Sequence, residues 1–313
     1  MILNLFKKIR HFRSRLSPQD QLRLRLAGII LIILLATVWL NCPGYAHNTK
    51  PRKVLVLHSY HQGYKWTDDI AKGLKTAFSK SPLRMVLNIE YMDTKRATAY
   101  GYYETLSNFY QKKYSGQTFD IIVCSDNNAV EFMSSYGRKL FPGIPVVFCG
   151  FNFLREKDLI GLEGFTGVNE EADLKSGLDL ALRLHPDTTT IYVINDRTPT
   201  GSRVMERLRE VTPDFANRAE FVYLDNLAMH DLLGTLRSMA PGDLVFYTFF
   251  FRDQANRFFE YDESIRLISE NCPVPIYGAW DFSLGNGIVG GLLTSGYYQG
   301  QAAGQLPDRL HLL

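Results

Sequence analysis

The stretch Val54-Leu-Val-Leu-His-Ser-Tyr60 indicates the fold, because four apolar residues run directly into a cluster of polar and aromatic residues. Four later stretches have the same form: Ile121-Ile-Val-Cys before Ser125-Asp-Asn-Asn128, Val146-Val-Phe-Cys before Gly150-Phe-Asn152, Ile191-Tyr-Val-Ile before Asn195-Asp-Arg-Thr198, and Leu244-Val-Phe-Tyr before Thr248 through Arg252. Short apolar runs separated by helix-like stretches are typical of buried parallel strands. In open α/β sheets, ligands bind beyond the carboxyl ends of the strands, where these polar clusters lie.

Strand and helix patterns alternate along the chain, and the alternation starts afresh near residue 190. The expected strands are 53–58, 85–91, 119–124, 145–149, 190–195, 219–224, 243–248 and 274–277, with a short strand-like connector at 165–169. The expected helices are 66–80, 97–114, 127–140, 170–184, 201–211, 228–239 and 255–271. This order predicts an α/β fold with two Rossmann-like lobes, each built on a parallel sheet with crossover helices. The glycine- and aromatic-rich segment 279–295 suits a hinge crossing between the lobes.

Composition and charge favour a globular, exported protein that does not bind nucleic acid. The 313 residues are 46% hydrophobic and 21% charged, which is sufficient to bury the cores of two domains. Seven basic residues precede the apolar run 26–40, and without them and Asp20 the chain has 28 basic and 31 acidic residues. This mildly acidic body argues against nucleic-acid binding. The basic flank and apolar run predict a signal peptide or an N-terminal membrane anchor over residues 1–47.

Four motifs occur in an order that is typical of one protein family. They are the stretch VLVLHSYHQGYKWTDD from Val54 to Asp69, Cys124-Ser-Asp-Asn-Asn128, Gly150-Phe-Asn152, and YGAWDFSLGNGIVGG from Tyr277 to Gly291. Together they resemble the ABC transporter substrate-binding family of periplasmic binding proteins, and most of all the version that forms the extracytoplasmic sensor region of bacterial histidine kinases. The resemblance covers roughly residues 53–303.

The resemblance implies a type I periplasmic-binding-protein fold, in which two lobes are joined by three crossing strands and close on a ligand. Residues 52–151 and 281–304 are expected to form lobe 1, and residues 152–280 lobe 2. Members of the family would continue with a helix packed back on the first lobe, and the sensors would then add a second membrane helix and a kinase. Residues 305–313 are therefore expected to be a truncated or divergent tail.

The expected function is that of an extracytoplasmic solute-binding protein or sensor domain. It would reside in the periplasm, free or anchored to the inner membrane through residues 26–40. The closed protein would deliver its small-molecule ligand to an inner-membrane ABC permease or signal through a histidine kinase output module. Lobes whose strand ends face one another form a cleft, and such clefts are preferred sites for small ligands.

The candidate ligand-binding residues follow the strands or lie where the lobes cross. They are Ser59, Tyr60, Trp66, Asp126, Asn127, Asn152, Asp196, Thr198, Phe250, Trp280 and Asp281. Their aromatic rings and carboxylates predict a ligand with a flat or apolar body and a cationic group, such as an amino acid or an amine.

Several candidates also have a purely structural interpretation. Asp126, Asp196 and Thr198 lie where helix N-caps belong, and capping alone favours these residue types by about 1 kcal/mol. Trp66 could cover a helix start, and residues 249–251 could belong partly to the core. Asp281 has no obvious capping role.

An enzyme with a Rossmann-like core, such as a hydrolase or a nucleotide-dependent transferase, is the alternative use of the same cleft. The sequence lacks the G-x-S-x-G elbow of hydrolases and the G-x-x-x-x-G-K phosphate loop, so a binding module without catalytic residues is favoured. No metal site or cofactor is expected, because His58 and His61 have no further ligand at a familiar spacing. Cys124 and Cys149 are interpreted as buried free thiols or as a disulfide, which an oxidising compartment permits.

Overall fold

The computed structural model describes residues 50–309 except 98, 156, 157 and 159, together with residues 17, 19, 20, 26, 27 and 29. The described residues from 50 to 309 belong to one compact unit. Most of the expected signal peptide or anchor, including nearly all of the run 26–40, lies outside the described residues. Among the helices of the described part, none is both long enough and apolar enough to cross a membrane.

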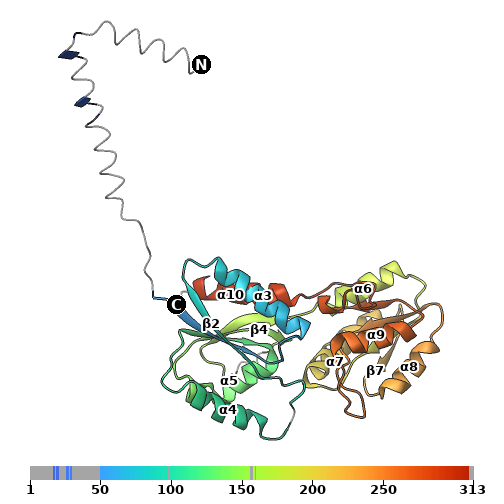
Figure 1. The fold of residues 1–313 in the computed structure, drawn as a ribbon. Helices are drawn as coiled ribbons and strands as arrows, with labels where there is room; N and C mark the ends of the chain where they lie inside the picture. Colours follow the sequence, from blue (N-terminus) through green and yellow to red (C-terminus); the bar gives the residue numbers. More distant parts are fainter. Residues whose placement is uncertain are drawn as a thin grey trace. The chain divides into compact units, whose positions relative to one another are not determined.

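A five-stranded parallel sheet forms the first half of this unit (Figure 1). Its strands are β1 (Arg52–His58), β2 (Met85–Tyr91), β3 (Ile121–Ser125), β4 (Val146–Asn152) and β5 (Phe165–Glu170), in the order β2-β1-β3-β4-β5. The expected strands are present, and the connector 165–169 is the fifth strand. Because β5 pairs with β4, residues 165–170 belong to this sheet and not to the second lobe, where the sequence placed them.

Helices cover both faces of the first sheet, which explains why its central strands β1, β3 and β4 are largely apolar on both sides. In β1, Val54 and Val56 belong to one apolar cluster, whereas Leu55 and Leu57 belong to another on the opposite face. The helices α3 (Lys65–Ser79) and α10 (Gly296–Arg309) lie side by side on one face, and α4 (Tyr102–Lys113) and α5 (Asp126–Leu140) cover the other (Figure 1). The part built on this sheet is called the first lobe below.

The contact between α3 and α10 depends on glycines. A Cβ atom at Gly300 would lie 2.1 Å from the backbone oxygen of Ile70, and one at Gly73 would lie 2.1 Å from that of Tyr297. Only glycine therefore allows the two helices to approach this closely. Since α10 extends to Arg309, residues 305–309 of the expected tail continue this helix.

A four-stranded parallel sheet forms the second half, called the second lobe below. Its strands are β6 (Thr190–Ile194), β7 (Glu220–Leu224), β8 (Asp243–Tyr247) and β9 (Ile276–Gly278), in the order β7-β6-β8-β9. Its helices are α6 (Leu174–Leu184), α7 (Pro199–Val211), α8 (Met229–Arg237) and α9 (Tyr261–Asn271), with short 3-10 helices η2 (Thr212–Phe215) and η3 (Asp281–Ser283). The helix expected from residue 255 begins at Tyr261, because Arg252 and Phe258 first form an antiparallel bridge.

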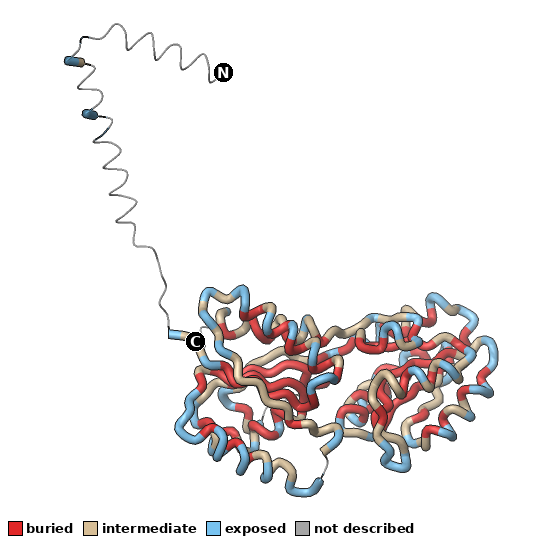
Figure 2. The backbone as a smooth tube through the Cα atoms, in the orientation of Figure 1, coloured by how far each residue is buried: buried red, intermediate tan, exposed pale blue. Residues whose placement is uncertain are grey.

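Buried residues concentrate in the strands of both sheets and in the helix faces that touch them (Figure 2). One apolar cluster contains residues of both lobes, such as Val54 of β1 and Val193 of β6. The aromatic residues Tyr60, Trp66 and Phe251 belong to this same cluster. The strand ends of both lobes therefore meet in a shared, largely aromatic region.

Candidate ligand-binding site

A small cavity lies in this shared region, beyond the carboxyl ends of strands from both lobes. Its empty volume, including space open to solvent, is about 240 Å³. Seven aromatic residues line it: Tyr60, Tyr64, Trp66, Phe249, Phe251, Trp280 and Phe282. The polar residues in its wall are Lys95, Asp126, Asn152, Glu170 and Thr200. A cavity with aromatic walls and a few convergent polar groups is the usual form of a small-molecule site.

Two buried carboxylates face this cavity, and an indole N–H group holds each of them. The Nε1 atom of Trp66 donates to Oδ1 of Asp126 over 2.7 Å, and that of Trp280 donates to Oε1 of Glu170 over 2.6 Å. Both acidic residues are only 2% exposed. The second oxygen of Asp126, Oδ2, is buried and has no hydrogen-bond partner among the described residues. Asp126 thus retains an acceptor that a ligand could use.

The backbone of Asp126 has a strained conformation that directs its carboxylate toward the cavity. Asp126 follows β3 directly and begins α5 with a φ of 68°, which an L-residue adopts at a cost of order 1–3 kcal/mol. Its Oδ1 atom would lie 2.8 Å from a Cβ atom at Gly150, so glycine at that position leaves room for the carboxylate. Strained residues of this kind cluster at functional sites.

Burial and mutual repulsion shift the ionisation of these groups strongly. Burial raises the pKa of the Asp126 carboxyl to about 7, although the hydrogen bond from Trp66 and the charge of Lys95 oppose the shift. Burial, reinforced by the charge of Asp126, raises the pKa of Glu170 to about 8. Both carboxyls are therefore poised near neutral pH, and a cation brought between them would favour their charged forms.

The ammonium group of Lys95 lies against three aromatic rings of the cavity wall. Its Nζ atom is 3.7 Å from the ring centroid of Phe251, 4.2 Å from that of Tyr60 and 5.4 Å from that of Tyr64. Cation–π contacts of this kind are worth about 0.5–2 kcal/mol each. Although Lys95 as a whole is half-buried, enclosure of its ammonium group lowers the pKa of Lys95 to about 8.

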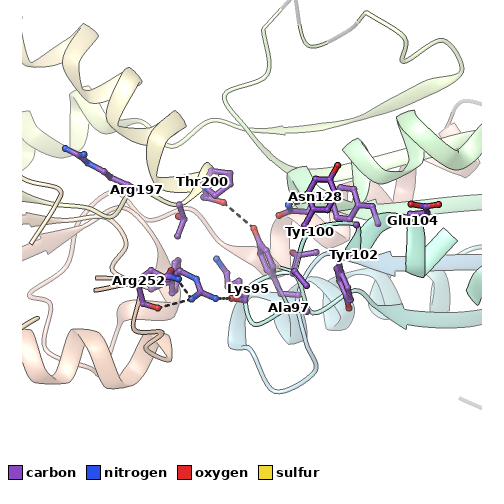
Figure 3. A pocket seen from close by; sticks show the side chains of 18 of the residues that line it. Lys95, Ala97, Tyr100, Tyr102, Glu104, Asn128, Arg197, Thr200 and Arg252 are labelled. Carbon is purple, nitrogen blue, oxygen red and sulfur yellow. Dashed lines mark hydrogen bonds between the residues drawn. The ribbon is translucent and has the colours of Figure 1, made fainter. Parts of the chain in front are cut away.

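A larger groove adjoins the cavity, and Tyr60, Lys95, Thr200 and Phe251 line both (Figure 3). The first lobe contributes Tyr60, Asn128, Tyr136 and residues 94, 95, 97 and 99–104 to this outer groove, and the second lobe contributes residues 197–200, 251–253 and 256. Two contacts cross it: Tyr60 Oη lies 3.4 Å from Thr200 Oγ1, and Arg252 Nη2 donates to the backbone oxygen of Lys95 over 2.7 Å. The described conformation is therefore one in which the lobes touch.

Five of the residues expected from sequence line the cavity, namely Tyr60, Trp66, Asp126, Asn152 and Trp280. Ser59 and Asn127 do not line the cavity, and their side chains form hydrogen bonds within the first lobe. Ser59 Oγ donates to the backbone oxygen of Ser125 and accepts from the backbone N–H of Ala129, which ties β1 to α5. Asn127 Oδ1 accepts from the backbone N–H of Asn152.

Asp196 and Thr198 position the second-lobe wall without lining the cavity. Thr198 caps α7, because its side chain accepts from the backbone N–H of Gly201, as the capping interpretation anticipated. Asp196 accepts from Thr198 through Oδ1 and from the backbone N–H of Phe251 through Oδ2, over 2.7 Å in the latter case. This carboxylate therefore fixes the loop that carries the cavity residues Phe249 and Phe251.

Phe250 and Asp281 lie away from the cavity. Phe250 points into the apolar cluster on the opposite side of the second sheet, against Phe259, while its neighbours Phe249 and Phe251 face the cavity. The cavity is thus lined by the two neighbours of Phe250 and not by Phe250 itself, which was the residue expected from sequence. Asp281 begins η3 and is half-buried, and one of its carboxylate oxygens is buried without a partner among the described residues.

Seven lining residues are missing from the set expected from sequence: Tyr64, Lys95, Glu170, Thr200, Phe249, Phe251 and Phe282. Glu170 was not expected to bind the ligand because the sequence placed it at the start of a helix. In the structure it ends β5, and α6 begins only at Leu174. Its position at a strand end was the available signal. Lys95 lies in a loop after β2, where the sequence shows no periodic pattern.

Cysteines and potential metal ligands are the remaining groups that the sequence singled out. Cys124, Cys149 and Cys272 are free thiols in this part of the chain. Within the same residues, no group of three or more potential metal-ligating side chains comes together.

Solved structures resemble this arrangement of sheets. The L-Trp complex of the ABC domain from Streptococcus pneumonia has a TM-score of 0.59 and 14% identity over 84% of this chain and 85% of that one. A ligand-free, open substrate-binding protein with adhesive properties from Clostridium difficile has a TM-score of 0.55 and 15% identity over 83% and 85%. The isoleucine complex of the branched-chain amino acid transporter substrate-binding protein LivJ from Streptococcus pneumoniae has a TM-score of 0.52 and 10% identity over 74% and 65%.

This chain has the fold of a type I periplasmic binding protein. At identities of 10–15% the likeness concerns the fold alone. The chain matches no protein-family model and no curated protein sequence. In this periplasmic-binding-protein fold, the described cavity lies between the two lobes, at the carboxyl ends of their strands.

Proposed function

We propose that this protein is an extracytoplasmic solute-binding protein or sensor domain that closes on a small molecule with an ammonium group and a flat or apolar body, such as an amino acid or an amine. The observation that carries the proposal is the pair of buried carboxylates, Asp126 and Glu170, inside a cavity with aromatic walls. Buried carboxylates are costly unless a cation accompanies them. A ligand ammonium would supply that charge, and the rings would supply cation–π contacts.

The two lobes would close on the ligand because residues of both lobes line the cavity. Tyr60, Trp66 and Asp126 come from the first lobe, whereas Thr200, Phe249 and Phe251 come from the second. A ligand that touches both sets favours the conformation in which they meet, by the difference in its affinity for the two conformations. Two proteins of the same fold are solved with L-Trp and with isoleucine, which supports an amino-acid-like ligand here.

The partner would be an inner-membrane ABC permease or a histidine kinase output module. Removal of residues 1–47 as a signal peptide would favour delivery to a permease from the periplasm. Retention as an anchor would favour signalling at the inner membrane. Mass spectrometry of the mature N-terminus in the producing cell distinguishes these two outcomes.

Amines and amino acids with aromatic or apolar bodies are expected to raise the melting temperature of the purified protein. Saturation at 100 times the dissociation constant corresponds to about 2.7 kcal/mol of stabilisation. This amounts to a shift of roughly 5–10 °C for a domain of this size. The measurement is a thermal-shift screen of amines, amino acids, sugars and carboxylic acids, followed by calorimetry and by mass spectrometry of co-purified ligand.

The matched variants for this screen are Glu170→Gln and Glu163→Gln. Glu170→Gln removes the negative charge that Glu170 would carry beside a bound cation and is expected to weaken amine binding at least about 30-fold, since losing one partner of a buried charge pair costs about 2–5 kcal/mol. Glu163 is exposed and pairs with Arg138 at the surface, so its substitution should leave binding unchanged. Equal stabilisation by sugars or anions, or no stabilisation by any compound, would refute the proposed ligand class.

A further inference from the structure

We propose that Lys95 is an internal stand-in for the ligand: its ammonium group occupies the position that the ammonium group of a bound primary amine takes, and the amine binds by displacing it. The inference rests on the proposed function, because it concerns the same cavity. It adds that the head group of the ligand is a primary alkylammonium and that Lys95 weakens the apparent affinity of the protein for it.

The surroundings of the Lys95 ammonium are those of a receptor for an amine. The three rings within 5.4 Å of Nζ come from both lobes: Tyr60 and Tyr64 from the first, and Phe251 from the second. Among the described residues that line the cavity, Lys95 is the only basic one. Its side chain is a butylammonium chain attached to the backbone, so any alkylammonium ligand would compete for the same rings.

The charges around Lys95 also match those that a ligand cation would meet. The carboxylates of Asp196, Asp126 and Glu170 favour its charged form, and Arg252 opposes it. Within the described residues, however, the second carboxylate oxygen of Asp126, Oδ2, is buried and has no hydrogen-bond donor, so Lys95 does not satisfy it. A free amine is not limited by a backbone attachment, so it can both contact the rings and donate to Oδ2. The exchange of Lys95 for a ligand is therefore favourable for an amine of suitable length.

Lys95 has space into which it can move. Its side chain lies at the boundary between the cavity and the outer groove, whose empty volume, including space open to solvent, is about 1690 Å³ (Figure 3). Glu104 and Asp253 line this groove and could accept the displaced ammonium. The backbone of Lys95 is held by Arg252, so a change of side-chain rotamer is sufficient and the contact between the lobes can persist.

Chemical complementation of Lys95→Ala tests the inference. The substitution removes the side chain beyond Cβ, and n-propylammonium supplies the three missing carbons and the ammonium group. Calorimetry at pH 7 is expected to show n-propylammonium binding at least 10-fold more tightly to Lys95→Ala than to the wild-type protein. The uncharged 1-propanol, of similar size, should not bind measurably.

Two further variants serve as controls. Lys95→Met removes the charge but keeps an apolar side chain of similar length, so it preserves packing if the alanine variant fails to fold, and it too should bind n-propylammonium more tightly than the wild type. Lys113 also lies against aromatic rings, 5.5 Å from the centroid of Phe109 and 5.6 Å from that of Tyr114, but it lines neither the cavity nor the outer groove. Lys113→Ala should therefore bind n-propylammonium as the wild type does.

The outcomes separate this inference from the proposed function. If an amine from the screen stabilises the wild type but the Lys95 variants bind n-propylammonium no better, Lys95 is not a stand-in, and the proposed function survives. If the Lys95 variants bind that amine more weakly than the wild type, Lys95 contacts the ligand directly, which also overturns the inference. If no amine binds any of these proteins, both proposals are wrong.

Discussion

The Asp126→Asn variant is expected to melt about 5–10 °C above the wild-type protein at pH 8 in the absence of ligand, while losing amine binding. Folding raises the pKa of this carboxyl to about 7, from an ordinary value near 4, chiefly through burial. The folded protein therefore holds the proton more tightly, and the resulting stabilisation is fully present below about pH 4 and lost as the pH rises to about 7. Asparagine has no charge to bury, so it escapes this loss.

The stability difference between the variant and the wild type should consequently depend on pH. It is expected to be small at pH 4, to grow up to about pH 7 and then to level off at a value on the order of 2–4 kcal/mol. Lys95, Glu170 and Asp196 share the electrostatic environment of Asp126, and the positive charge of Lys95 reduces the difference. Thermal denaturation from pH 4 to pH 9 measures it. A difference that is constant over this range would contradict the explanation.

The surface variant Glu163→Gln is the control for this experiment. Its side chain is 72% exposed and forms an ion pair with Arg138, which is itself 80% exposed. Exposed pairs contribute about 0–1 kcal/mol, so the melting temperature should change little at any pH. The contrast between the two variants would show that the cavity stores an electrostatic cost that a cationic ligand relieves on binding.

The Gly300→Ala variant is expected to lose about 3 kcal/mol of unfolding free energy, because overpacking at a close backbone contact forces the elements apart. The added Cβ atom would lie 2.1 Å from the backbone oxygen of Ile70, a group that cannot turn aside as a flexible side chain could. The helices α10 and α3 would have to separate. Urea denaturation measures the loss, and an unchanged midpoint would show that the two helices are not held at the described distance.

Gly234→Ala is the matched control within another helix. Gly234 lies in α8, and a Cβ atom at this position would have no heavy atom within 4 Å. Alanine is a better helix former than glycine by about 0.8–1 kcal/mol, so this variant should be as stable as the wild type or slightly more stable. Opposite effects of the same substitution would isolate the close approach of α3 and α10 as the cause.

The fold could be predicted closely because its strongest signals are local. Buried parallel strands are continuous apolar runs, and those of β1, β3, β4, β6 and β8 are visible directly in the sequence. Which sheet a short strand joins is a non-local property, however, and β5 was therefore assigned to the second lobe although it pairs with β4 in the first. The start of α9 was placed too early because the bridge between Arg252 and Phe258, which delays it, is a contact that no local pattern indicates.

The cavity was predictable in part, for reasons that differ between residues. Tyr60 and Asp126 directly follow strands, so the rule on carboxyl ends finds them. Phe251 could not be distinguished from Phe250, because β8 ends at Tyr247 and the alternation beyond a strand end is not fixed by sequence. Lys95 reaches the cavity from a loop, and only the folded chain brings it to the opposite lobe's Phe251.

The attachment of each carboxylate to an indole also gives the protein an optical reporter. Two of its three tryptophans, Trp66 and Trp280, donate their N–H groups to the cavity carboxylates, and the third is Trp39. Indole fluorescence responds to nearby charge and to water, so the emission of a Trp39→Phe protein would originate entirely from these two rings. Occupancy of the cavity should then be readable from the emission wavelength without any added dye.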